Sequence, residues 1–354
     1  MTDRTNRRIV YKTPPQGSPQ PSDFECVTET LPELASGQML LRTRWLSIDP
    51  YMRSDFMGYA KNVGKTMPGD TLSEVVESRV EGWSPGDLVV GYYGWQEYSI
   101  GTADDVRWDV PSMPIQKWDG SLGPASSAVG VLGMPAYSAY QGMIRVAKIQ
   151  AGETAVLSAA SGAVGQVAGQ LARIQGARAV GIAGGPDKCA YCVEELGFDA
   201  CVDYKADSFP EALAKAVPDG IDVYFEGVGG AVLEAVIPLL KPDSRIPVCG
   251  WVADYNVDRD KWGPTPLQRL KAEGFPVLGK DGSQAGYRMF TFGELSADPV
   301  AADQALRTLS GYIGEGKLRY RESITDGLDS AVDAFIGMLR GKNFGKTVVR
   351  MGNE

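Results

Sequence analysis

The chain has 354 residues, a formal net charge of −9 and a hydrophobic content of 44%, which suits about two domains of roughly 150 residues, each with a buried core. This composition excludes a fibre or a generally disordered chain, and the acidic balance argues against a nucleic-acid partner. The chain contains no histidine, so it has no Ser-His-Asp relay, no histidine general base and no zinc site that uses histidine.

The first part of the chain, up to about residue 109, predicts a compact all-β barrel. Its short β-prone runs are separated by Pro-Gly, Gly and Asp turn signals, which are typical of an antiparallel barrel. The runs cover residues 8–12, 39–47, 72–80, 87–93 and 95–100.

From residue 154 the pattern changes to alternating strands and helices, which predicts right-handed crossovers and a doubly wound parallel sheet. Strands are expected over 154–160, 177–183, 200–204, 222–226, 245–249 and 275–278, and helices over 163–175, 187–196, 210–216, 231–240 and 266–273. A helix over 299–313 and the elements 318–324, 328–339 and 346–351 follow, and we expect this tail to return to the N-terminal domain. The predicted division is therefore 1–130 for the barrel, 131–312 for the nucleotide-binding domain and 313–354 for the return.

Cysteine usage favours a reducing, cytoplasmic location, because five cysteines form an odd and sparse set in a long chain. Cys189 and Cys192 have the spacing of a redox motif, but they fall on a helix away from the first strand-helix turn, and we interpret them as structural. A zinc site that combines them with Cys201 would lack a fourth ligand nearby, so no metal is expected. The polar N-terminus shows no signal peptide, and the long uncharged stretches 121–144 and 154–172 are too interrupted by polar residues and glycine for membrane spans.

The clearest chemical motif is Ala-Ser-Gly-Ala-Val-Gly over residues 160–165, which follows an apolar strand and opens a helix. In a dinucleotide-binding fold, Gly162 lets the backbone approach the pyrophosphate and Gly165 permits close packing of the helix on the sheet. Ser161, Ala163 and Val164 complete the predicted phosphate-binding turn. The alternative is a plain tight turn, which needs glycine whatever it binds.

The end of the second strand of this domain favours NADPH over NADH. An NAD site usually carries an acidic residue there for the ribose 2′-hydroxyl, whereas this chain has Gly184 and Gly185 followed by Lys188. The glycines leave room, and the ammonium group can bind a 2′-phosphate. The alternative is that Lys188 is a solvated helix residue.

Seven motifs in order along the chain resemble the zinc-independent medium-chain dehydrogenase/reductases of the prostaglandin reductase, alkenal double-bond reductase and curcumin reductase group. They are LSIDPYMR at 46–53, GWQEY at 94–98, LGMP at 132–135, AASGAVG at 159–165, GVGG at 227–230, CG at 249–250 with Tyr255 and Asn256, and NFGKTVV at 343–349.

This resemblance implies a GroES-like β-barrel domain, a Rossmann domain, NADPH and a homodimer. It also implies hydride transfer to the β-carbon of an α,β-unsaturated aldehyde or ketone, followed by protonation of the enolate. The family pattern places Lys188 and Tyr204 at the adenosine 2′-phosphate of the cofactor. It places Asn343 near the cofactor phosphates or the nicotinamide end. The remaining cofactor contacts that we expect from the shared motifs are Val228, Cys249, Gly250 and Tyr255.

The resemblance places Tyr255 where the family has a tyrosine beside the substrate carbonyl. Tyr255 is therefore the predicted catalytic residue, because a hydroxyl donor there would stabilise the negative charge that develops on the carbonyl oxygen. A ribose hydroxyl of the cofactor is a second candidate donor. Tyr51 is expected to shape the pocket or to replace Tyr255 as donor. The alternative is that both tyrosines only pack, as a buried ring with its hydroxyl at a water interface commonly does.

The motifs leave other functions open. The chain could be a quinone oxidoreductase or an alcohol dehydrogenase, or it could be a structural or regulatory protein that binds NADPH without turnover. The missing zinc ligands argue against a zinc-dependent alcohol dehydrogenase. The chain departs from the family pattern in a shortened loop between Tyr59 and Thr71 and in a polar stretch with Lys280, Asp281 and Ser283. These departures bear on the identity of the substrate more than on the reaction type.

Overall fold

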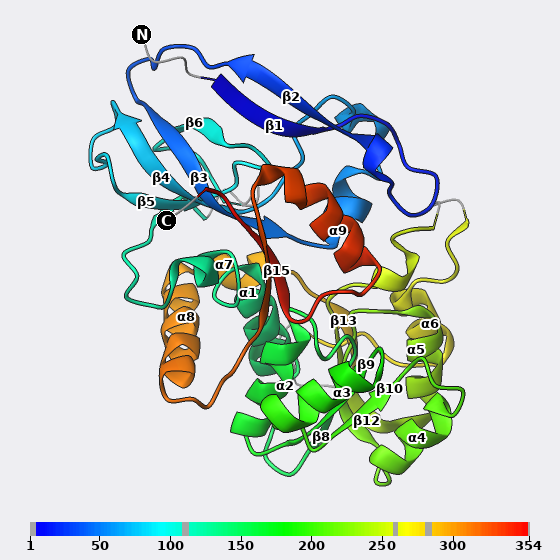
Figure 1. Cartoon of the computed structure of the whole chain (residues 1–354). Helices are drawn as coiled ribbons and strands as arrows, with labels where there is room; N and C mark the ends of the chain where they lie inside the picture. Colours follow the sequence, from blue (N-terminus) through cyan, green and yellow to red (C-terminus); the bar gives the residue numbers. More distant parts are fainter. Residues whose placement is uncertain (1–4, 108–112, 258–260, 280–284, 353–354) are drawn as a thin grey trace. The chain divides into compact units, whose positions relative to one another are not determined.

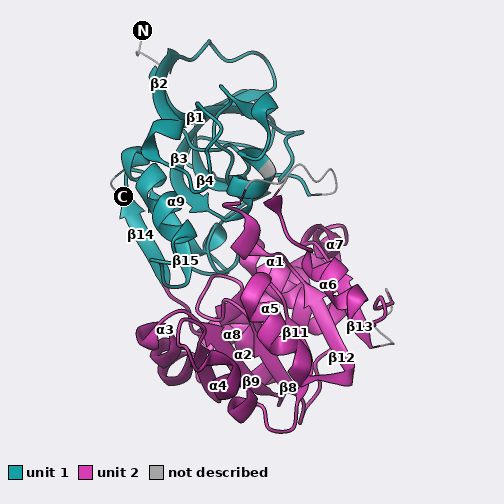
Figure 2. Ribbon diagram, turned by 90° about the vertical axis from the view of Figure 1, so that its right-hand side faces the viewer, with its two compact units in different colours: residues 1–133, 322–354 teal, residues 134–321 magenta. Residues whose placement is uncertain are grey.

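The computed structural model describes residues 5–107, 113–257, 261–279 and 285–352 (Figure 1). They form two compact units, coloured separately in Figure 2: unit 1 contains residues 1–133 and 322–354, and unit 2 contains residues 134–321. Unit 1 is built mainly of β-strands and unit 2 around a parallel sheet with helices, so the predicted α/β class with a β domain and a Rossmann domain is confirmed. The units divide after residues 133 and 321, where the sequence predicted limits at 130 and 312.

Unit 1 contains a seven-stranded sheet that joins the two ends of the chain. Its strands follow the order β14-β15-β3-β4-β5-β7, and β6 pairs with β3. The C-terminal strand β15 runs antiparallel to β3, with Thr347 opposite Ile48. The bounds are β3 (Gln38–Ile48), β4 (Thr71–Ser78), β5 (Leu88–Gly91), β6 (Tyr98–Thr102), β7 (Gln116–Lys117), β14 (Glu322–Asp326) and β15 (Lys346–Arg350).

A separate two-stranded ribbon of β1 (Thr5–Tyr11) and β2 (Phe24–Thr30) completes unit 1 together with helix α9 (Ala331–Leu339). The aromatic rings of Phe24, Trp95 and Phe335 meet in its core, with Trp95 and Phe335 edge to face at 5.6 Å. These buried rings belong to one hydrophobic cluster, in which the ribbon packs with α9.

Unit 2 contains a six-stranded parallel sheet in the order β10-β9-β8-β11-β12-β13. The strand order reverses between β8 and β11, so their carboxyl ends form the switch point where open α/β sheets bind ligands. The strands are β8 (Thr154–Leu157), β9 (Arg178–Ala183), β10 (Ala200–Asp203), β11 (Ile221–Phe225), β12 (Leu240–Val248) and β13 (Gly286–Met289). The helices are α1 (Met134–Tyr140), α2 (Gly165–Ile174), α3 (Pro186–Ala190), α4 (Phe209–Ala216), α5 (Gly230–Val236), α6 (Pro266–Ala272), α7 (Gly293–Ser296) and α8 (Pro299–Gly314).

The predicted strand over 275–278 is wrong, because β13 provides the sixth strand. Residues 275–278 contribute only one isolated bridge, between Val277 and Tyr287. Pro276 has no amide hydrogen for a ladder, and Val277 is 67% exposed. The apolar run therefore lies beside the sheet without extending it.

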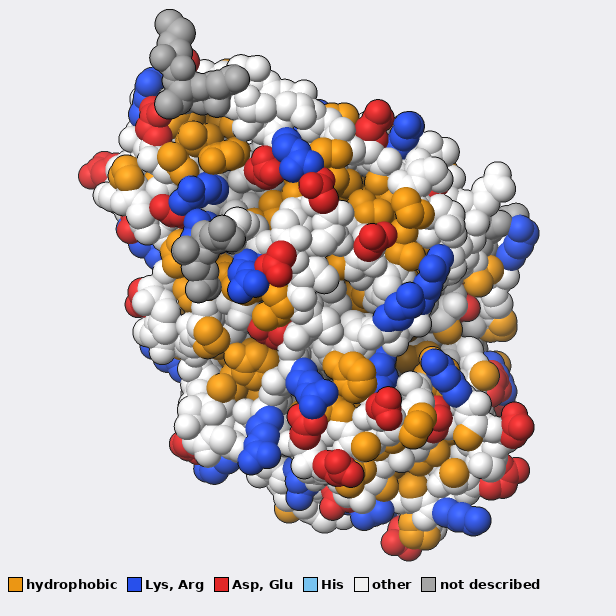
Figure 3. Space-filling model, viewed as in Figure 1, with side chains coloured by type: hydrophobic (Ala, Val, Ile, Leu, Met, Phe, Trp, Pro, Cys, Tyr) orange, Lys and Arg blue, Asp and Glu red, His pale blue; other side chains and the backbone are white. Residues whose placement is uncertain are grey.

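The surface shown in Figure 3 intersperses acidic and basic side chains. Within the described residues, no helix is both long and apolar enough to span a bilayer.

Candidate functional site

The turn between β8 and α2 forms a close-fitting backbone cradle. Ala159 adopts a left-handed backbone with φ of +48°, and the amide of Gly162 donates to the Ala159 carbonyl oxygen over 2.8 Å. A Cβ on Gly165 would lie 2.4 Å from that oxygen and 2.8 Å from the Cα of Ala160. Only glycine therefore fits at position 165.

The same turn suits a pyrophosphate. A Cβ on Gly162 would meet only the turn's own Ala159 within 4 Å, so the outer side of the turn is bare backbone. Within the described part of the chain, the amides of Ala163 and Val164 donate to no backbone carbonyl, and both precede the ten-residue helix α2. Amides at a helix N-terminus bind anions well, so the residues present fit the phosphates of a dinucleotide.

A cluster of basic side chains lies at the carboxyl ends of β9 and β10. A Cβ on Gly184 would lie 2.8 Å from the Tyr204 ring and 3.1 Å from Cε of Lys205. The Lys205 ammonium stands 6.0 Å from the centre of that ring. Burial lowers the pKa of Lys188, and the neighbouring positive charge of Lys205 lowers it further. Two cations and a tyrosine hydroxyl therefore gather beside Gly184, a donor set that fits a 2′-phosphate.

The sequence prediction named Lys188, Gly184 and Tyr204 but missed Lys205. Asp203 organises this corner, since its Oδ1 accepts hydrogen bonds from the amides of Gly185 and Lys205 at 2.8 and 2.9 Å. The available signal was the order Asp203-Tyr204-Lys205, which begins at the last residue of β10.

Tyr255 and Gly250 are brought together after β12. Tyr255 is half-buried and follows the short 3-10 helix Val252–Asp254. A Cβ on Gly250 would lie 3.0 Å from the Tyr255 hydroxyl oxygen. Cys249 precedes this glycine, and burial raises the pKa of its thiol to about 12, so the thiol is neutral at physiological pH. The structure thus brings three of the predicted residues to the carboxyl end of one strand.

Glu226 is a functional candidate that the sequence analysis missed. Glu226 follows β11 and is fully buried. Burial raises the pKa of its carboxyl to about 7, although hydrogen bonds from the amides of Val228 and Gly229 oppose the rise. An acidic residue at the end of the apolar run 221–225 was the only signal.

Tyr51 and Asn343 belong to unit 1. The hydroxyls of Tyr51 and Tyr92 are 3.1 Å apart, and burial raises the pKa of Tyr51 well above its usual value. The Asn343 side-chain amide donates to the Gly345 carbonyl oxygen at 2.9 Å. Their predicted catalytic and cofactor-binding roles stay predictions, and the polar stretch with Lys280, Asp281 and Ser283 lies outside the described residues.

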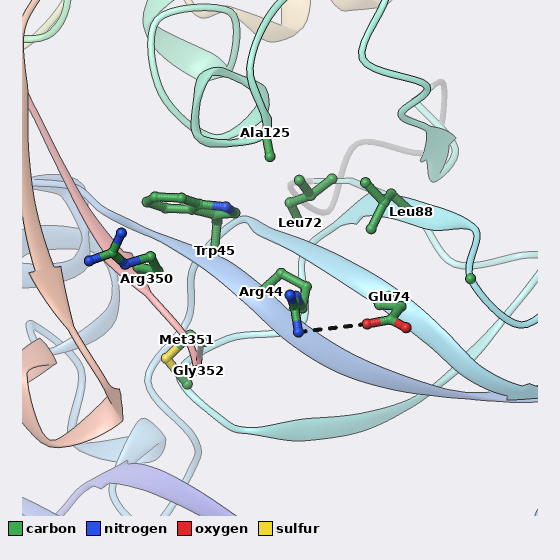
Figure 4. Close-up of a pocket in the computed structure, with 10 residues that line it drawn as sticks. Arg44, Trp45, Leu72, Glu74, Leu88, Ala125, Arg350, Met351 and Gly352 are labelled. Atoms are coloured by element: carbon green, nitrogen blue, oxygen red, sulfur yellow. Dashed lines mark ion pairs between the residues drawn. The ribbon is translucent and has the colours of Figure 1, made fainter. Parts of the chain in front are cut away.

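Unit 1 also contains a cavity of about 230 Å³ (Figure 4). Trp45 and Leu72 line it together with the ion pair of Arg44 and Glu74, whose charged atoms are 3.8 Å apart. The residues that line this cavity include none of the predicted site residues.

Three cysteines, on α3, on the following π-helix Tyr191–Glu195 and on β10, form a compact thiol group. The thiols of Cys189 and Cys201 interact, and Cys201 also interacts with Cys192, which is buried. The interaction with Cys201 and burial raise the pKa of the Cys189 thiol far above the usual range. At Cys201 the interaction with Cys189 lowers the pKa, but the interaction with Cys192 and burial outweigh it and raise the pKa overall, so neither thiol is a reactive thiolate. Across the described ranges, no group of three or more Cys, Asp or Glu side chains is arranged to hold a metal ion.

Comparison with known proteins identifies the family. Residues 7–108 match the family described as the N-terminal domain of oxidoreductase, and residues 163–288 match the zinc-binding dehydrogenase family. The chain is 42% identical over 363 residues to the NADPH-dependent curcumin reductase of Escherichia coli (strain K12), covering 99% of this chain and 98% of that protein. It is a medium-chain dehydrogenase/reductase of the curcumin reductase and prostaglandin reductase group.

Two further similar proteins support the same family assignment. Prostaglandin reductase 1 of Rattus norvegicus is 38% identical over 347 residues, which cover 95% of this chain and 96% of that protein. The crystal structure of CurA in complex with NADPH from Vibrio vulnificus superposes with a TM-score of 0.86 at 37% identity, covering 98% of this chain and 100% of that chain. The predicted family is therefore confirmed, and as a member of this group the chain is an oxidoreductase.

Proposed function

We propose that the chain reduces the carbon-carbon double bond of α,β-unsaturated aldehydes and ketones with NADPH. NADP dependence follows from the group to which the chain belongs, in which the curcumin reductase relative is named NADPH-dependent. The observation that carries the proposal for the reaction is the placement of the Tyr255 hydroxyl against Gly250. This places a hydroxyl donor beside the carboxyl end of β12, in the sheet whose first strand leads into the phosphate cradle.

Each part of unit 2 then has a defined task. The turn 161–165 binds the pyrophosphate through backbone amides, while Lys188, Tyr204 and Lys205 hold the 2′-phosphate that distinguishes NADPH from NADH. Val228, Cys249 and Gly250 form the wall toward the nicotinamide end. The neutral thiol of Cys249 adds no charge there.

NADPH, when bound, supplies the hydride. Reduction at the β-carbon leaves negative charge on the carbonyl oxygen of the substrate, and the Tyr255 hydroxyl donates a hydrogen bond to that oxygen. A proton from solvent then adds to the α-carbon of the enolate and completes the reduction. A donor that is already oriented toward the developing charge stabilises the transition state more than the ground state, and it therefore lowers the barrier. Tyr51 contributes to the substrate pocket, and Asn343 contacts the cofactor. A homodimer and a cytoplasmic location are further parts of this proposal.

Steady-state kinetics with a panel of electron acceptors tests the function. NADPH consumption is measured with enals, enones, quinones and saturated ketones at equal concentration. The proposal expects kcat/KM for enals and enones to exceed that for saturated ketones and quinones by at least about tenfold. A preference for quinones would identify a quinone oxidoreductase, and NADPH binding without turnover of any acceptor would identify a non-catalytic protein.

A further inference from the structure

We propose that Glu226 is a positioning residue for Tyr255, acting through the three-residue strap 227–229. The inference rests on the proposed role of Tyr255 in the reaction. It concerns only residues of unit 2, and each link is a hydrogen bond between described atoms.

The first link joins the Glu226 carboxyl to the strap. Its Oε1 accepts hydrogen bonds from the amide of Val228 at 2.6 Å and from the amide of Gly229 at 3.0 Å. Two consecutive amides that point at one oxygen fix the path of the backbone as it leaves β11. Because Glu226 is fully buried, water cannot replace this acceptor if the side chain is removed.

The second link joins the strap to the turn that carries Tyr255. The carbonyl oxygen of Gly227 accepts from the amide of Val252 at 3.1 Å, and that of Val228 accepts from the amide of Ala253 at 3.0 Å. The Tyr255 amide in turn donates to the Val252 carbonyl oxygen at 3.3 Å. A shift of the strap therefore moves the 3-10 helix Val252–Asp254 and the tyrosine that follows it.

The third link joins the same anchor to the cofactor cradle. The Ser158 hydroxyl accepts from the amide of Gly227 at 2.8 Å and donates to the Phe225 carbonyl oxygen at 2.9 Å, with Glu226 Oε1 a further acceptor at 3.4 Å. Ser158 directly precedes the turn that begins with Ala159. Both the cradle and the strap are thus held at the switch point between β8 and β11.

The acceptor oxygen, not the charge, is what this role needs. The other carboxyl oxygen, Oε2, and the Tyr224 hydroxyl make no hydrogen bond within the described part of the chain. Tyr224, Ser158 and Cys249 are the polar or titratable groups that interact with this carboxyl. Glutamine at 226 retains Oε1 for both amides, whereas alanine leaves the Val228 and Gly229 amides buried without an acceptor.

The test compares Glu226→Ala with Glu226→Gln and uses Glu322→Gln as a matched control. Glu322 is a half-buried glutamate of unit 1 whose pKa is also raised by burial. Three quantities are measured: kcat for a good enone, the NADPH dissociation constant by fluorescence titration, and amide hydrogen exchange of peptides spanning 227–230 and 251–257.

Glu226→Ala is expected to lower kcat by about tenfold or more, which corresponds to about 1.4 kcal/mol, with a smaller change in the NADPH dissociation constant. Exchange should rise in both peptides. Glu226→Gln should remain within about threefold of the wild type in kcat and should restore protection in both peptides. Glu322→Gln should leave exchange in these peptides unchanged.

Unchanged exchange over 251–257 in Glu226→Ala would overturn the proposal, as would a glutamine variant that is as impaired as the alanine variant. If Glu226→Ala does not fold, Ser158→Ala replaces it, because it removes the acceptor of the Gly227 amide and should raise exchange in the same two peptides. If the wild type reduces no enone, or if Tyr255 proves dispensable, the proposed function fails while the exchange data still decide whether Glu226 anchors the strap.

Discussion

The Tyr255 hydroxyl lies directly against Gly250, where a Cβ would be only 3.0 Å from its oxygen. The contact arises because β12 ends just before Gly250, and the chain then turns through one short 3-10 helix to bring Tyr255 back over it. The Tyr255 hydroxyl can therefore occupy this position only because residue 250 has no side chain.

Gly250→Ala should slow enone reduction by shifting this hydroxyl. The backbone at 250 is not left-handed, so alanine is sterically acceptable there, and a contact of 3.0 Å must relax by a few tenths of an ångström. We expect kcat to fall about three- to tenfold, since small misplacements of a catalytic group are costly, with little change in melting temperature. Gly311→Ala is the matched control, because α8 leaves open space at that position. Unaltered kcat in Gly250→Ala would contradict the contact.

Tyr255→Phe should keep the fold and NADPH binding but lower kcat. Loss of one dominant oxyanion donor costs on the order of 10² in turnover, and a ribose hydroxyl that shares the task would reduce the loss. Steady-state kinetics beside a thermal melt separates chemistry from stability, with Tyr312→Phe on α8 as the control. A lower melting temperature with unchanged kcat would instead make Tyr255 a packing residue, with Tyr51 the next donor to test.

Lys188→Ala should weaken NADPH binding selectively. A hydrogen bond to a charged group contributes roughly 1.5–3 kcal/mol, so the NADPH dissociation constant should rise about 10- to 100-fold while that for NADH stays nearly constant. Lys205→Ala should act in the same direction but less, because Lys205 is exposed. Fluorescence titration with both cofactors measures this, with Lys215→Ala on α4 as the control. An unchanged preference for NADPH in the Lys188→Ala variant would refute the assignment.

Glu226→Gln should change how stability depends on pH. Burial raises the pKa of this carboxyl from 4.5 to about 7, so its contribution to stability is complete below about pH 4.5 and is lost as the pH rises through 7. Glutamine does not titrate. The free energy of unfolding of the variant relative to the wild type should therefore increase between pH 4.5 and pH 8, by at most about 3 kcal/mol.

Denaturant unfolding of both proteins across this pH range provides the measurement, and other titrating groups cancel in the difference. A difference that stays constant from pH 4.5 to pH 8 would show that Glu226 does not titrate in this range.

The sequence predicted the elements whose pattern follows directly from burial. Strands β8, β9 and β11 are short, mostly apolar runs, and the glycines at 162 and 165 mark the turn between β8 and α2. Only the second half of β12 was predicted, because its first half contains Lys241, Pro242, Asp243 and Ser244. Strand β2 was missed because only Phe24 of its seven residues is buried, so no alternation of apolar and polar residues reveals it. Edge strands of this kind owe their structure to backbone pairing with a neighbour.

Local sequence also could not predict contacts between distant segments. Glu226 reads as a solvated acid beside a glycine-rich turn, and only the parallel sheet places it at the buried junction of β8 and β11. The left-handed backbone of Ala159 and the approach of Lys205 to Lys188 likewise depend on neighbouring strands. The cluster of Tyr255, Cys249 and Gly250 could be predicted from the sequence because these three residues belong to a motif shared with the family.

The most direct test of the central claim is reduction of an enone with NADPH that carries deuterium at the transferable position, followed by NMR of the product. The account predicts that NADPH and enone are consumed in equal amounts, that the deuterium lies on the β-carbon and that the carbonyl group remains intact. Deuterium on the carbon of a newly formed alcohol, or no consumption of the enone by protein that binds NADPH, would contradict it.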